Sequence, residues 1–113
     1  MKALADPEIK VSLAEREIAG PKAAVDPAFL AVVERVSAEV FPGVPVIPMM
    51  SSGATDSKYF RLAVIPAFGV SGLFVDMDDV RAHGRDERLG VKQFYEGQEF
   101  LWQLVQALAA EKP

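Results

Sequence analysis

The sequence contains no cysteine and only one histidine and one tryptophan. Without cysteine it has no disulfide, no thiol nucleophile and no cysteine-ligated zinc, so a metal site would have to use His, Asp and Glu. No apolar run approaches the roughly 20 residues that span a bilayer, and the first ten residues include acidic residues and a proline where a signal peptide needs an apolar core. We therefore expect a soluble chain that does not enter a membrane, and the sequence leaves its compartment open.

An excess of basic charge is also missing. Lys and Arg number 12 against 16 Asp and Glu, which gives a net charge of -4 with the two signs interspersed. Neither an acidic tail nor a basic patch stands out, so nucleic-acid binding is not expected. A chain of 113 residues that is 50% hydrophobic fits one small domain.

Three segments have helical patterns. Asp26 followed by Pro27 is typical of an N-cap and a first helical position, and this helix should end near Phe41, before Pro42. Thr55 can cap a second, short helix, and a long amphipathic helix is expected over residues 91–110. The apolar residues expected on inner faces are Phe29, Val33, Val36 and Val40, then Tyr59, Phe60 and Leu62, then Leu101, Leu104, Val105 and Leu108; Phe94, Tyr95, Phe100 and Trp102 are interpreted as packing aromatics.

Three other segments are predicted as short strands. Residues 9–13 alternate apolar and polar side chains, and residues 44–50 and 65–70 are apolar runs between turn residues. Strands that alternate with helices predict an α/β fold, here a partial αβα sandwich with a short, mostly parallel sheet and three helices. Residues 20–24 read as a linker and residues 71–90 as a long loop. So narrow a parallel sheet suggests a piece of something larger.

The only histidine, His83, begins the segment HGRDER between a predicted strand and the last helix. A neutral imidazole in such a loop can ligate zinc, and the alternative is an ordinary surface histidine. Residues 51–56 lie at a strand-to-helix turn, where backbone N–H groups can hold a carboxylate or a carbonyl, unless this is simply a capped turn. A serine hydrolase is disfavoured because no Gly-x-Ser-x-Gly is present. The acidic residues at 76, 78 and 79 lack the glycine and closing glutamate of a calcium loop.

The segments at residues 52–57, 65–71 and 83–89, followed by a helix that contains Phe94-Tyr95-Glu96-Gly97, resemble the C-terminal part of the co-catalytic zinc metallopeptidases. This is the family of aminoacylase, carboxypeptidase G, glycine-Xaa carboxypeptidase and succinyl-diaminopimelate desuccinylase. The likeness covers roughly residues 7–108. It implies a catalytic domain interrupted by a lid domain, so that residues 1–20 end a lid or dimerisation domain with one strand, residues 21–25 form the hinge and residues 26–113 form the C-terminal part of the catalytic domain.

The resemblance also assigns roles to particular residues. His83 matches the last protein ligand of a site for two zinc ions, and Glu87 and Arg88 match positions that support its loop. The residues that match the substrate-binding loop and a second wall of the pocket are Gly53, Ala54, Thr55 and Asp56, and Ser71 and Gly72, respectively.

This sequence departs from the family pattern because it lacks the His-x-Asp, the glutamate pair and the further acidic ligand. One imidazole cannot hold two zinc ions, since a zinc site takes three or four protein ligands. We therefore expect no catalytic residue in this chain. It is predicted to be the C-terminal fragment of a zinc-dependent amidohydrolase, carboxypeptidase or deacylase acting on peptides or N-acyl amino acids, inactive by itself and prone to self-association. The alternative is a stand-alone binding or interaction module that kept the fold without catalysis.

Overall fold

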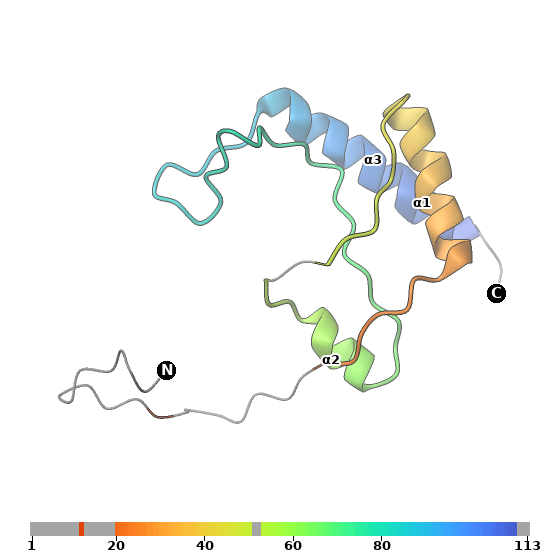
Figure 1. Cartoon of the computed structure of the whole chain (residues 1–113). Helices are drawn as coiled ribbons and strands as arrows, with labels where there is room; N and C mark the ends of the chain where they lie inside the picture. Colours follow the sequence, from red (N-terminus) through yellow and green to blue (C-terminus); the bar gives the residue numbers. More distant parts are fainter. Residues whose placement is uncertain (1–11, 13–19, 51–52, 111–113) are drawn as a thin grey trace.

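The computed structural model describes residue 12, residues 20–50 and residues 53–110. These residues form three helices, α1 (Pro27–Val40), α2 (Ser57–Leu62) and α3 (Val91–Ala110). Figure 1 shows α1 and α3 side by side, with α2 set apart from both. The strand predicted at residues 9–13 lies outside the described residues except for Ser12, and so does the predicted end of a lid domain at residues 1–20 except for Ser12 and Gly20. Over the described ranges, no helix combines the length and apolar character needed to cross a membrane.

Helix α1 begins and ends where its sequence predicts. The Asp26 carboxylate accepts a hydrogen bond from the Ala28 N–H at 2.9 Å, and Pro27 occupies the first helical position. At the other end Phe41 is the C-cap, and Gly43 has a φ of +82° that turns the chain away from the helix axis. Local capping chemistry therefore fixes both ends of α1.

The core of the described structure lies between α1 and α3. Its buried residues are Val32, Val33 and Val36 from α1 and Phe100 and Leu104 from α3. The predicted inner face of α1 is confirmed, because Val33 and Val36 are buried and Phe29 and Val40 pack against the same cluster. Helix α3 has the predicted length, but its buried face is centred on Gly97, Phe100 and Leu104.

The prediction of an α/β sandwich is wrong for the described residues. Residues 44–50 and 65–70 are all described, and they contain no strand. The only regular elements among the described residues are the three helices. A strand exists only when a neighbour completes its backbone hydrogen bonds, and no such ladder forms here. Pro45, Pro48 and Pro66 also remove N–H donors from these segments. Apolar composition alone therefore gave a false strand signal.

Helix α2 is short, and its apolar side chains are not on an inner face. Tyr59, Phe60 and Leu62 are 63%, 52% and 44% exposed, because α2 packs against neither of the other described helices. The helix ends in a Schellman motif, in which the Ile65 N–H donates to the Phe60 carbonyl at 2.9 Å. The left-handed residue of this motif is Val64, with a φ of +62°, where glycine is usual.

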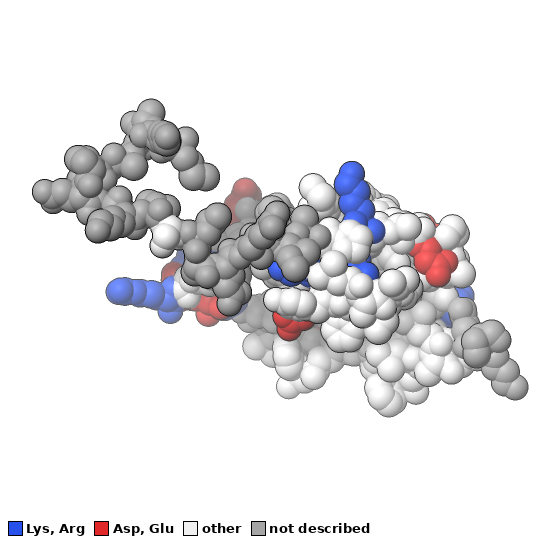
Figure 2. Space-filling model, turned by 90° about the horizontal axis from the view of Figure 1, so that it is seen from below, with Lys and Arg blue, Asp and Glu red and all other residues white. Residues whose placement is uncertain are grey.

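Large apolar side chains are exposed over much of the described surface. Phe100 is buried, but Phe94, Tyr95 and Trp102 are 45%, 65% and 61% exposed, so of the predicted packing aromatics only Phe100 belongs to the core. Figure 2 shows broad uncharged surface with only scattered acidic and basic side chains. Apolar surface on this scale marks an interaction site more often than a solvated face.

Candidate functional site

His83 lies in a tight turn within the predicted long loop. The Gly84 N–H donates to the Arg81 carbonyl at 2.9 Å, which closes a four-residue turn with His83 at its third position. His83 has a φ of +63°, a left-handed conformation that favours glycine and asparagine. The residue is exposed, and Figure 1 shows the loop projecting beyond the beginning of α3. The turn therefore presents the imidazole to solvent at the cost of backbone strain.

Ion pairs close this loop. Asp79 accepts a hydrogen bond from Arg88 Nη2 at 2.5 Å on one carboxylate oxygen and from Arg81 Nε at 2.5 Å on the other. Arg81 also pairs with Asp86 through Nη1. The hydrogen bond from Arg88, and after it the one from Arg81, lowers the pKa of the Asp79 carboxyl below its ordinary value. Asp79 thus stays charged at neutral pH and joins the two arms of the loop.

The two residues predicted to support the His83 loop differ in their contacts. Arg88 reaches across the loop to Asp79, as a scaffold residue would. The Glu87 N–H donates to the Gly84 carbonyl at 3.4 Å, whereas the Glu87 carboxylate makes no ion pair with any residue the structure describes. Asp79 and Arg81 were not predicted, and the sequence signal for them was only the alternation of charges on both sides of His83.

The predicted substrate-binding loop lines a hollow of about 420 Å³ beside α2. Thr55 accepts a long hydrogen bond, 3.4 Å, from the Ser57 N–H, so it supports the start of α2 although Asp56 is the N-cap residue. Sequence reasoning missed the two cations that share this hollow. The residues lining it are Gly20, Gly53, Ala54, Thr55, Asp56, Lys58, Tyr59 and Arg61.

Arg61 fixes one side of the hollow. Its Nε donates to the Pro21 carbonyl at 3.0 Å, and its Nη1 donates to the Ala67 carbonyl at 3.4 Å. The guanidinium therefore holds Pro21, in the linker predicted at residues 20–24, beside the segment after α2. A basic residue three positions after Lys58 on a short helix was the available signal, because residues at that spacing share a helix face.

Ser71 and Gly72 lie elsewhere, alongside α3. The Ser71 hydroxyl accepts a hydrogen bond from the Leu73 N–H at 3.1 Å, and Gly72 is buried against Phe100. Neither residue lines the hollow beside α2. The close approach of Gly72 to α3 gives this glycine a packing role.

The structure does not bring the predicted site residues into one place. In Figure 1 the His83 loop and α2 lie at different ends of the described fold. In the described ranges, no three His, Asp or Glu side chains are grouped so as to hold a metal ion. These residues therefore do not fit a complete zinc site, and His83 offers a single imidazole.

The family of the chain follows from comparison with known proteins. A model of peptidase family M20/M25/M40 matches residues 8–107, which include α1, the hollow beside α2, the His83 loop and most of α3. The match thus spans most of the 113 residues. This chain belongs to peptidase family M20/M25/M40.

Proposed function

We propose that this chain contributes one metal-ligating histidine and one wall of a substrate pocket to a zinc-dependent hydrolase of peptides or N-acyl amino acids. In this proposal His83 is the ligand, and the remaining ligands and the general base come from residues outside the described set. The described residues alone lack the three or four protein ligands that a zinc ion takes. The isolated chain should therefore not hydrolyse such substrates.

The conformation of His83 is the observation that carries the proposal. A non-glycine residue in the left-handed region costs about 1–3 kcal/mol and persists only where the surroundings enforce it. Here that position is occupied by the only histidine of a metallopeptidase-family chain, exposed at the tip of an ion-paired turn. Glycine would satisfy the backbone better, so the imidazole itself is the reason to keep histidine there.

The hollow beside α2 is the proposed substrate wall. Its glycines, alanine and threonine leave room for a ligand, and the two cations Lys58 and Arg61 outnumber the one carboxylate, Asp56, so the lining keeps a net positive charge. A carboxylate of a peptide or N-acyl amino acid matches this charge, and a threonine hydroxyl can donate to it. The identity of the acyl group or amino acid is set by residues beyond this wall.

Zinc titration followed by NMR of the imidazole tests the ligand role. With one histidine in the chain, the imidazole signals belong to His83 without further assignment. We expect Zn²⁺ to shift them with weak affinity, because one ligand cannot retain the ion. His83→Asn is the matched variant, since asparagine tolerates a positive φ and keeps the turn while removing the imidazole.

Two results would contradict the ligand role. Tight zinc binding that is retained in His83→Asn would place the metal site elsewhere. Imidazole signals that do not shift when Zn²⁺ is added would show that His83 is an ordinary surface residue. In a polypeptide that supplies the other ligands, His83→Asn should abolish hydrolysis of an N-acyl amino acid while leaving the melting temperature nearly unchanged. Retained hydrolysis there would likewise reject the assignment.

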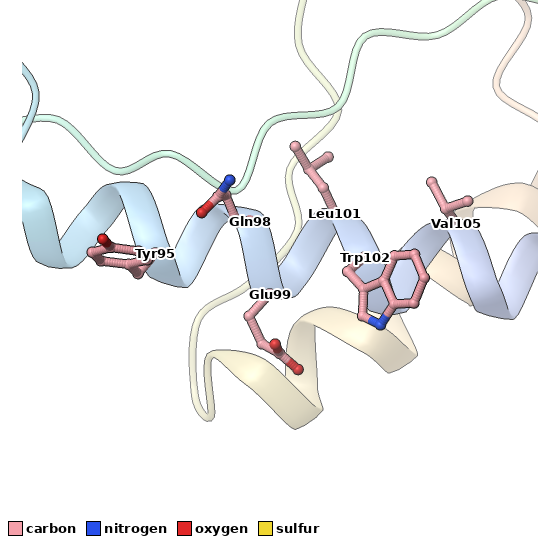
Figure 3. Close-up of a pocket in the computed structure, with 6 residues that line it drawn as sticks. All are labelled: Tyr95, Gln98, Glu99, Leu101, Trp102 and Val105. Carbon is pink, nitrogen blue, oxygen red and sulfur yellow. The ribbon is translucent and has the colours of Figure 1, made fainter.

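The outer surface of α3 supports a second proposal, which is the self-association expected of a fragment. Figure 3 shows Leu101 and Val105 projecting above the helix, with Trp102 lower and in front of it. With Tyr95, Gln98 and Glu99, these residues form an open, shallow and mainly apolar surface, here called the α3 face. We propose a second copy of the chain as its occupant.

The area of the α3 face predicts weak association. Tyr95 and Trp102 are 65% and 61% exposed, and whole aromatic side chains bury 150–250 Å² each, so the two leave roughly 250 Å² per copy. Even with Leu101 and Val105 added, two copies fall short of the roughly 1,200 Å² of a stable specific interface. Light scattering should therefore show an average mass that rises with protein concentration, and Trp102→Gln should lower it. The control is Val91→Gln, which changes an exposed residue outside the α3 face and should leave the mass unchanged. A monomer at every concentration would reject this candidate.

A further inference from the structure

The His83 loop has no apolar anchor. Between residues 76 and 90 no side chain is buried, and the side chains of Asp79 and Arg81 are only 34% and 33% exposed. Hydrophobic packing therefore cannot hold the left-handed turn at His83. The ion pairs and the backbone bonds of the turn remain to do so.

A single carboxylate connects the two arms of this loop. Asp79 precedes the turn and Arg88 follows it, so their contact closes the segment from residue 79 to residue 88. Within the closed segment, Arg81 binds the other oxygen of Asp79 and also contacts Asp86. Because Arg81 is also the first residue of the turn that contains His83, its position sets where the turn begins.

We propose that Asp79 is a positioning residue for His83, whose turn it fixes by holding Arg81 and Arg88 at once. The inference rests on the proposed function, because it takes the His83 imidazole to be the metal ligand that this turn positions. It extends that function to a residue that touches neither metal nor substrate. Hydrogen bonds between charged groups are shorter and stronger than neutral ones, which suits a loop without apolar support.

Backbone ¹⁵N relaxation of the 113-residue chain tests this inference without metal and without activity. We expect amide order parameters near about 0.85 at His83 and Gly84 in the wild type, and below about 0.6 in Asp79→Asn, with α1 and α3 unchanged. The matched control is Asp78→Asn, which removes the same charge from the neighbouring residue. The Asp78 carboxylate makes no ion pair with the described residues. It should leave the loop rigid, and both variants should melt at the same temperature.

Two further measurements separate an ion-pair effect from a general loosening. Salt at about 1 M, where the Debye length is about 3 Å, should lower the order parameters of the wild-type loop more than those of Asp79→Asn, in which only the pair between Arg81 and Asp86 remains to be screened. Asp79→Glu, which restores the charge, should recover part of the lost order. A loop that stays rigid in Asp79→Asn, or that loosens equally in Asp78→Asn, would overturn the inference.

These outcomes are independent of the zinc titration of His83. A rigid loop in Asp79→Asn, together with a zinc response that His83→Asn removes, would reject the positioning role and keep the ligand. A loosened loop with no zinc response in the wild type would reject the ligand and keep Asp79 as the residue that orders the turn.

Discussion

Replacing Gly72 with alanine tests whether this residue packs against α3 or faces a substrate. A Cβ at this position would lie 2.6 Å from Phe100 Cδ1 and 2.9 Å from Phe100 Cβ and Cγ. Phe100 is only 3% exposed and contributes to the core, so it has little room to move aside. Overpacking of this kind typically costs about 1–3 kcal/mol. We therefore expect Gly72→Ala to lower the free energy of unfolding by that amount.

Urea denaturation followed by far-ultraviolet circular dichroism measures this effect. Gly69→Ala is the control, because a Cβ there would meet no atom within 4 Å, and it should be neutral or stabilising by about 0.4–1 kcal/mol. Phe100→Leu should make room for the new methyl group, so that the double variant loses less stability than the sum of the single variants. Equal stability of Gly72→Ala and Gly69→Ala would refute the packing role of Gly72.

Three further predictions concern caps and charge. Val64→Gly should slow hydrogen exchange of the Ile65 amide about fivefold, because relief of the left-handed strain is worth about 1 kcal/mol. Asp26→Ala should cost about 1 kcal/mol of unfolding free energy by removing the bond to Ala28 N, as measured by urea denaturation. The pKa of Asp79 is lowered in the folded chain, so its ion pairs stabilise the loop fully at any pH above the unfolded pKa of about 3.9. This stabilisation is lost as the pH falls through the lower pKa of the folded chain, and the amide order parameters of the loop should drop in that pH range.

Each of these predictions has a control and a contradicting result. Val64→Ala keeps the left-handed cost and should leave Ile65 exchange nearly unchanged, whereas a gain equal to that of glycine would remove strain as the cause. Asp26→Asn retains a side-chain acceptor and should cost much less than alanine; an equal loss would assign the effect to the negative charge of Asp26 and not to the capping hydrogen bond. The Asp79→Asn loop should show no comparable pH dependence, and a similar acid transition in that variant would assign the effect to another group.

Only part of the candidate site could be predicted from the sequence. His83 and the residues 53–56 could be found because a single histidine and a small-residue turn are visible in the order of the letters. The pairing of Asp79 with Arg88 was not visible, because it joins residues nine positions apart in an irregular loop with no periodicity. The role of Arg61 was missed because its contact with the Pro21 carbonyl spans 40 positions, which the helical spacing from Lys58 does not reveal.

The sequence by itself determined the helices of this protein, and the tertiary structure decided what they bury. Asp26 and Pro27 begin α1 through contacts within one turn, and such local bonds need no partner. The apolar pattern of α3 gave its length, and Leu104 and Leu108 lie on the core side as predicted. Leu101 and Val105 are nevertheless 39% and 59% exposed while Phe100 is buried, because the contact with α1 selected a face shifted around the helix. The absence of a sheet from the described residues has the same cause: a strand needs a neighbour, and no single segment specifies whether one is there.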